Sequence, residues 1–231
     1  MSSVPRKLGY ALVGDMVGSR LVVDHEEMRR QVAAALELMN RRFANVLWAP
    51  LMLTKGIDEF SGVASSPEEV FELLCQLNVE VHPRSFRLGA AWGETIDLSR
   101  RRLASSMEGS AFHRAAVALE RARTEHLPIA LGVCAGDQCG LLLQAVEAMA
   151  SLDAALRSKW TPAVVKVARD LIQARERRPT QTKIARRTHR SQQAISQTVL
   201  RGRFKELARG GAAIRNLLVE IHRLAQHAPD C

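Results

Sequence analysis

Two aspartates near the start of the chain are placed where they could hold a divalent cation. Asp15 follows the apolar run Leu8–Val13, and Asp58 stands at the tip of an expected hairpin within Leu51–Ala64. Carboxylates at the ends of neighbouring central strands can converge on one or two Mg²⁺ ions, as in sites that hold a nucleoside triphosphate for in-line displacement. Each acid alone is equally consistent with capping a turn. The pair together predicts a metal site formed by Asp15 and Asp58.

The segment after Asp15 contains the residue types of a phosphate cradle. Glycine has no side chain to block an approaching ligand, so backbone N–H groups in such a turn can reach phosphate oxygens. The predicted cradle consists of Met16, Val17, Gly18, Ser19 and Arg20. An ordinary connection from a strand to a turn is the competing interpretation.

Charge is distributed unevenly along the chain. The net charge is +9. Residues 1–150 contain 16 basic and 18 acidic residues, whereas residues 151–231 contain 17 basic and 6 acidic residues. All the excess positive charge therefore lies in the last third of the chain, which indicates a nucleic-acid partner for that part.

The composition is typical of a soluble globular protein, with 47% hydrophobic and 25% charged residues. We find no apolar stretch that reads as a membrane span and no signal-peptide pattern, so we expect a cytoplasmic protein with no membrane partner. The four cysteines are scattered, and we expect reduced thiols. Cys134 and Cys139 lack the spacing and the nearby histidines of a zinc site.

The order of apolar patterns predicts an α+β fold. The chain reads as strand, helix, hairpin, helix, strand, helix, strand and helix, over 8–13, 24–43, 51–64, 66–77, 85–94, 109–122, 128–133 and 140–156. The first five of these, with the hairpin counted as two strands, have the β-α-β-β-α-β order of a ferredoxin-like sheet, and an α-β unit follows. In that topology the end of the first strand meets the hairpin tip. We assign residues 1–157 to this domain.

Residues 158–231 are predicted to form an all-α domain. Two short helices, 180–187 and 191–200, joined by the turn 188–190, have the pattern of a helix-turn-helix. Ala185 is small where the helices would cross, and Ser191 is suited to cap the second helix. A solvated three-helix bundle with a charged face is the alternative.

The outward face of this pair carries the candidate DNA contacts. Glutamine can bond adenine and arginine can bond guanine through two hydrogen bonds each, whereas other basic side chains contact phosphates. The residues predicted nearest the bases are Ser191, Gln192, Gln193, Ser196, Gln197 and Arg201. Those predicted nearer the phosphates are Lys183, Arg186, Arg187, Arg190, Arg203 and Lys205.

The last helix has an apolar stripe made of Ile214, Leu217, Leu218, Ile221 and Leu224. Such a stripe either closes the helical bundle, which we favour, or forms a dimer seam. Helix-turn-helix proteins usually pair on two half-sites, so we expect a homodimer in either case.

Taken together, these motifs resemble the bacterial SatD family. The resemblance is carried in order by Gly14, Asp15, Ser19 and Arg20, by the hairpin Asp58-Glu59-Phe60, by the helix residues Gly109, Ala111, Phe112, Arg114 and Ala115, and by the C-terminal helix pair. It spans most of the chain. It implies a palm-like domain followed by a helix-turn-helix.

A looser resemblance covers the first part of the chain. Asp15–Ser19 and Ile57–Phe60 are similar to motifs of class III nucleotide cyclases and GGDEF enzymes. This resemblance implies Asp15 and Asp58 as ligands of Mg²⁺ or Mn²⁺, with a nucleotide whose triphosphate lies on the backbone of Met16–Ser19.

Two departures from the cyclase pattern bear on catalysis. Ile57 stands where glycine normally precedes the hairpin aspartate. The helix that in cyclases supplies an asparagine and, one turn later, an arginine carries Phe112-His113 and Ala116-Val117. Arg114 lies at a different phase, because a helix turns about 100° per residue. Nucleotide binding could survive these changes, but efficient stabilisation of a transition state could not.

We therefore predict a DNA-binding, transcription-regulatory protein whose first domain binds a nucleotide with a metal ion or mediates dimerisation. The alternative is a metal-dependent nucleotidyl cyclase or related phosphoryl-transfer enzyme. A third hypothesis is a non-catalytic dimerisation module fused to a DNA-binding domain, in which both acids cap turns.

Overall fold

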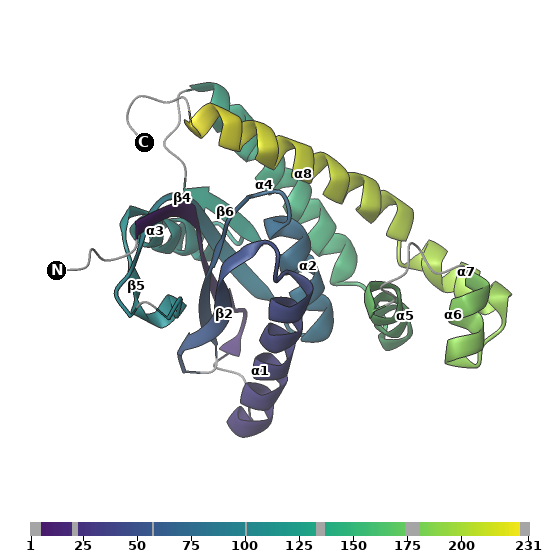
Figure 1. The fold of residues 1–231 in the computed structure, drawn as a ribbon. Coiled ribbons are helices and arrows are strands. Elements are labelled where there is room, and N and C mark those ends of the chain that lie inside the picture. The colour runs from purple at the N-terminus through teal and green to yellow at the C-terminus, as the bar shows by residue number, and fades with distance from the viewer. Residues whose placement is uncertain are drawn as a thin grey trace.

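The computed structural model describes residues 6–19, 23–56, 58–99, 101–132, 137–173 and 181–226. A six-stranded sheet has helices on both faces, and a group of short helices lies to one side of it (Figure 1). The strands are β1 (Arg6–Met16), β2 (Leu47–Lys55), β3 (Glu59–Ala64), β4 (Phe86–Asp97), β5 (Met107–Glu108) and β6 (Ile129–Gly132). The helices are α1 (His25–Arg42), α2 (Val70–Glu80), α3 (Ser110–Thr124), α4 (Asp137–Arg157), α5 (Pro162–Gln173), α6 (Gln181–Thr188), α7 (Gln192–Arg201) and α8 (Phe204–Gln226). The predicted α+β class is confirmed.

The sheet has the strand order β2-β3-β1-β4, with β5 and β6 both paired to β4. The central strand β1 is antiparallel to β3 and to β4, and β2 is antiparallel to β3. Each βαβ unit therefore encloses one strand of the other, which is the split arrangement that the element order predicts. The end of β1 consequently lies beside the start of β3.

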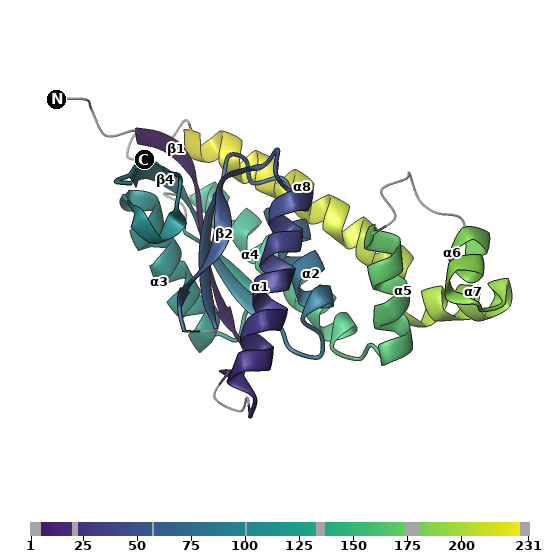
Figure 2. The same ribbon diagram turned by 60° about the horizontal axis from the view of Figure 1, so that its bottom comes forward.

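Alternation along β1 assigns its side chains to two faces, because successive residues of a strand point to opposite sides. Tyr10, Leu12 and Met16 are buried in the main core with residues of α1, α2, α4 and α8. Ala11 packs on the other face, against Ala111 and Ala115 of α3. Figure 2 shows α3 on one side of the sheet and α1 and α2 on the other.

Small residues let α3 approach the sheet closely. A Cβ atom on Gly89 of β4 would lie 2.2 Å from the carbonyl oxygen of Ala115 and 2.5 Å from the amide nitrogen of Leu119. Only glycine fits there without a shift of the helix backbone. This close approach places the C-terminal end of α3 near the end of β1.

The last helix corrects one prediction. Ile214, Leu218 and Ile221 of α8 are buried in the main core beside the sheet, whereas Leu207, near its start, packs with residues of α5. With 23 residues, α8 is too long to close a small bundle and extends across the sheet domain. The apolar stripe therefore completes the sheet core and does not close a bundle of α5–α7. The domain boundary at 157 and 158 stays a prediction, and α8 packs on both sides of it.

A second correction concerns α2. The helix predicted over 66–77 begins only at Val70, and its N-cap residue, Glu69, makes no side-chain cap hydrogen bond. The oxygen of Ser66 contacts the carboxylate of Glu68 at 3.4 Å. The start of α1 agrees with the helix predicted over 24–43, and Asp24 caps it by accepting a hydrogen bond from the Glu27 N–H.

The helix α4 is apolar over most of its length. Its stretch Cys139–Arg157 has the length and mean hydropathy of a helix able to cross a membrane, although Glu147 and Asp153 interrupt its apolar residues. One side of α4 packs against the sheet domain, however, since Val146 and Ala150 lie in the main core. The buried carboxylate of Glu147 on this side is paired with Arg121 of α3.

We predict that Gly89→Ala lowers the free energy of unfolding by about 1–3 kcal/mol, because the added methyl group collides with the backbone of α3. Gly210→Ala is the matched control, since a Cβ there meets nothing within 4 Å. Alanine within α8 should raise stability by about 0.5–1 kcal/mol. Urea unfolding of both variants measures the difference. Equal stability of the Gly89→Ala variant and the wild type would contradict the close packing of α3.

Candidate functional site

The end of β1 brings three charged side chains together. Asp15 of β1 is directly opposite Glu59 of β3, so both side chains project from the face that α3 covers. From α3, Arg123 places Nη2 3.0 Å from Asp15 Oδ1 and donates a hydrogen bond from Nε to Asp15 Oδ2 at 3.2 Å. Its Nη2 also lies 3.9 Å from Glu59 Oε2. A two-point contact of this kind fixes both the arginine and the carboxylate.

The cluster is half-buried, with 18% of the Asp15 side chain and 21% of the Glu59 side chain exposed. The hydrogen bond from Arg123 to Asp15 raises the pKa of the guanidinium. Glu120 of the same helix lies 3.2 Å from Arg123 Nη1. The guanidinium is thus surrounded by carboxylates and neutralises part of their charge.

Asp58 lies in the turn between β2 and β3, next to the end of β1 as predicted. Its carbonyl oxygen accepts a hydrogen bond of 2.8 Å from the Met16 N–H. The side chain that shares Arg123 with Asp15, however, belongs to Glu59, the next residue. Ile57, which departs from the cyclase pattern, lies outside the described residues.

The carboxylates have the hard oxygen atoms that Mg²⁺ and Mn²⁺ prefer. Both oxygens of Asp15 are in contact with Arg123, so the guanidinium would compete with an ion for this carboxylate. Within the described ranges, no group of three or more His, Cys, Asp and Glu residues could hold a metal ion. The metal site of Asp15 and Asp58 stays a prediction.

Part of the predicted phosphate cradle is already used within the protein. The Met16 N–H donates to Asp58, and the Val17 N–H donates to the Ser85 carbonyl oxygen at 2.8 Å. Gly18 has φ of 71°, in the left-handed region that favours glycine. Gly18 and Ser19 remain as candidates, and Arg20 lies outside the described residues.

The α3 residues that differ from the cyclase pattern are either packed within the protein, hydrogen-bonded within α3 or exposed. Phe112 packs against the alanine cluster beneath α3, and Ala116 and Val117 are exposed. Arg114 donates from Nη2 to Ser110 Oγ at 3.1 Å, within its own helix. These side chains do not reproduce an asparagine and an arginine directed at a phosphate.

The helices α6 and α7 present most of the predicted DNA contacts to solvent. Ile184, Ala185 and Ile195 are buried together with Val167 of α5 and hold the two helices on it. The exposed predicted contacts are Lys183, Arg186, Arg187, Arg190, Ser191, Gln192, Gln193, Gln197, Arg201, Arg203 and Lys205, and Ser196 is half-buried.

Some of these residues have structural partners. Ser191 Oγ accepts a hydrogen bond from the Ala194 N–H at 3.1 Å and caps α7 as predicted. Arg187 is 3.0 Å from the Asp170 carboxylate and donates to the Asp170 carbonyl oxygen at 2.6 Å. Arg187 therefore anchors α6 on α5. Thr180, the predicted start of this pair, lies outside the described residues.

Two of the three charged residues at the end of β1, Glu59 and Arg123, were not predicted as site residues from the sequence. Glu59 directly follows Asp58 in the chain, so it was an obvious second candidate. Its pairing with Asp15 depends on the register between β1 and β3, which the sequence does not give. Arg123 carries no motif. Its position in the last turn of α3 indicates only a favourable place for a cation in the helix dipole.

We predict that Arg123→Gln lowers the free energy of unfolding by about 1–3 kcal/mol, because two half-buried carboxylates lose their partner. Adding MgCl₂ should restore part of this loss in the variant and leave the wild type unchanged. Arg29→Gln, an exposed arginine of α1, is the control and should stay within about 0.5 kcal/mol. Equal stabilisation of wild type and variant by MgCl₂ would show that a cation binds beside Arg123.

Comparison with known proteins gives one match that covers most of the chain. A model of the SatD family matches residues 10–218. No curated protein matches the chain. Among solved structures, a bacterial light-regulated adenylyl cyclase is similar at 11% sequence identity and a TM-score of 0.41, over 56% of this chain and 44% of that chain. The matched residues include Asp15, Glu59 and Arg123 at the end of β1 and the helices α5–α7. Because the match covers most of the sequence, the chain belongs to the SatD family.

Proposed function

We propose that this protein binds double-stranded DNA through α6 and α7, which act as a helix-turn-helix, and that it is a cytoplasmic regulator of transcription. The observation that carries the proposal is the exposed face of these helices. The segment 181–205 contains seven basic residues and no acidic residue. All seven basic side chains are exposed, although Arg187 pairs with Asp170 and Arg203 with Glu206, so this face is accessible to phosphates.

The interior of the helix pair supports the same function. Ile195 of α7 and Ile184 of α6 are almost fully buried. Their burial turns the glutamines of α7 outward and fixes their direction. The Ser191 cap satisfies the first turn of α7 without using a glutamine side chain.

Recognition of a base sequence would depend on which side chains of α7 reach the edges of the bases. With α7 in the major groove, Gln192, Gln193 and Gln197 can each form two hydrogen bonds with adenine, and Arg201 can do so with guanine. Arg186 and Arg190 lie on α6 and the turn, where the phosphate backbone passes a recognition helix.

In this proposal the sheet domain is a scaffold and not a catalyst. Arg123 holds both oxygens of Asp15, and the Met16 and Val17 amides donate within the protein. A nucleotide with Mg²⁺ or Mn²⁺ would need a rearranged cluster before it could bind there. These contacts favour a regulator over a cyclase.

We further propose that the protein is a homodimer through α4. Leu141 and Leu152 are 71% and 68% exposed, which is high for large apolar side chains. The residues Leu141, Ala145, Ala148, Leu152 and Ala155 recur at spacings of four and three, the pattern of a helix that pairs with a copy of itself. A dimer would present two α7 helices to two half-sites.

The DNA-binding proposal predicts that the double variant Arg186→Ala, Arg190→Ala binds duplex DNA more weakly, whatever its sequence. The slope of log affinity against log salt concentration should fall by about two, because two phosphate contacts are lost. Fluorescence anisotropy of the full chain with a labelled random duplex measures both quantities. The double variant Arg209→Ala, Arg215→Ala removes the same charge from exposed positions of α8 and is the control. An equal loss in the control would refute a specific role for α6 and its turn.

The dimer proposal predicts that Leu152→Glu converts the protein to a monomer, since two buried carboxylates would face each other across the seam. Light scattering on a size-exclusion column gives the mass directly. Val117→Glu, at a 72% exposed position of α3, is the control and should remain dimeric. A monomeric wild type, or a dimeric Leu152→Glu variant, would contradict the proposal.

A further inference from the structure

A cavity of about 330 Å³ lies between α2, α4 and the segment that leads into α5. Its volume is within the range of small-molecule sites, roughly 300–1,000 Å³. Its lining is largely apolar and includes Phe71, Leu74, Pro128, Ala150, Ala154 and Trp160. Sites of this kind commonly lie where two parts of a protein meet, and this cavity lies where the helices α5–α7 join the sheet domain.

The charged groups deep in the cavity are matched. Arg157 donates to Asp153, with Nη2 3.2 Å from Oδ1 and Nε in contact with Oδ2. The Cys75 thiol lies 3.7 Å from Asp153 Oδ2, and burial raises the pKa of that thiol, so it stays protonated. The carboxylate and the guanidinium therefore balance each other and leave no net charge there.

Arg84 provides an unbalanced positive charge on the cavity lining. It is half-buried, and among the described residues its guanidinium has no hydrogen-bond or ion-pair partner. The neighbouring His82 has a pKa lowered by burial and then by Arg169, so its imidazole is uncharged at neutral pH. The cavity as a whole thus combines an apolar interior with one available cation.

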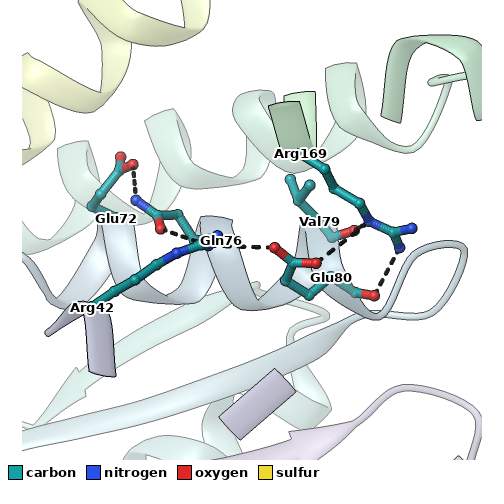
Figure 3. A network of polar contacts seen from close by, with 6 residues as sticks. All are labelled: Arg42, Glu72, Gln76, Val79, Glu80 and Arg169. Atoms are coloured by element: carbon teal, nitrogen blue, oxygen red, sulfur yellow. Dashed lines mark hydrogen bonds and ion pairs between the residues drawn. The ribbon is translucent and has the colours of Figure 1, made fainter. Parts of the chain in front are cut away.

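Hydrogen bonds hold α2 and Trp160, which line the cavity, in place against α5 and α7. Arg169 of α5 donates to the carbonyl oxygens of Val79 and Glu80 at 3.2 and 2.8 Å, and its Nε lies 3.5 Å from the Glu80 carboxylate (Figure 3). Glu80 also accepts from Arg42 of α1 at 3.3 Å. Trp160 is held by a hydrogen bond of 3.1 Å from Nε1 to the Gly202 carbonyl oxygen, at the end of α7. The cavity is therefore formed before any ligand enters it, which lowers the cost of binding.

We propose that this cavity binds a small aromatic carboxylate, with its ring among the apolar side chains and its carboxylate on Arg84. The size of the cavity suits a one- or two-ring acid, and Phe71 and Trp160 are aromatic residues of its lining. Arginine is well suited to a carboxylate because its planar fork matches the two oxygens. This site is separate from the DNA-binding face and does not depend on the function proposed for α6 and α7.

Calorimetric titration of the full chain with 1-naphthoate and with the uncharged 1-naphthamide tests the proposal. The wild type should bind one naphthoate per chain. Arg84→Gln should weaken naphthoate binding by about tenfold and leave naphthamide binding unchanged, because only the acid uses the guanidinium. Arg29→Gln is the matched control and should bind both compounds as the wild type does.

A second variant tests the location. Ala154→Leu fills the cavity and should abolish binding of both compounds, provided that its melting curve shows a folded protein. Arg84→Gln changes a half-buried side chain with no partner among the described residues, so it keeps the test decisive if Ala154→Leu does not fold. The proposal is overturned if the wild type shows no saturable binding, if Arg84→Gln binds naphthoate as the wild type does, or if folded Ala154→Leu still binds.

Discussion

The position of α5–α7 relative to the sheet depends on the burial of α8, which packs against α5 and against the core of the sheet domain. Near its start, Leu207 packs beside Trp160 and α5, and farther along Ile214, Leu218 and Ile221 enter the core under β1. A hydrogen bond of 3.0 Å joins His222 of α8 to Tyr10 of β1. Because α8 follows α7 directly, its anchoring limits how far α6 and α7 can turn relative to the sheet. The Arg169–Glu80 contact adds a second restraint on α5, so the exposed face of α7 is held by the sheet domain.

The end of β1 shows how one arginine changes the chemistry of an acidic sheet edge. The split sheet brings Asp15 and Glu59 side by side, which is the geometry from which a cation site could be built. The close packing of α3, allowed by Gly89 and the alanine cluster, brings Arg123 within 3.0 Å of Asp15. The guanidinium then neutralises part of the charge of the two carboxylates. The same edge therefore serves to join α3 to β1, which is consistent with a scaffold.

Local signals predicted much of this structure from sequence. The apolar run of β1 and the Ser191 cap of α7 depend on neighbours within a few residues, and both are found. The pairing of Asp15 with Glu59 depends on strand register, and the contact with Arg123 depends on how closely a helix approaches a sheet. Neither is encoded in any local pattern. The apolar stripe of α8 was recognised, but periodicity shows only that a face is buried and not which partner covers it. The exposed glutamines of α7 and its one arginine, Arg201, were identified because the buried positions of an amphipathic helix determine its outer face.

The claim that α6 and α7 form the DNA-binding surface is tested most directly by amide hydrogen exchange. Mass spectrometry would compare the full chain alone and with a duplex selected from a random pool. Slower exchange is predicted within residues 181–205, with the strands β1, β3 and β4 unchanged. Protection confined to the sheet domain, or no change anywhere with DNA in excess, would contradict the claim.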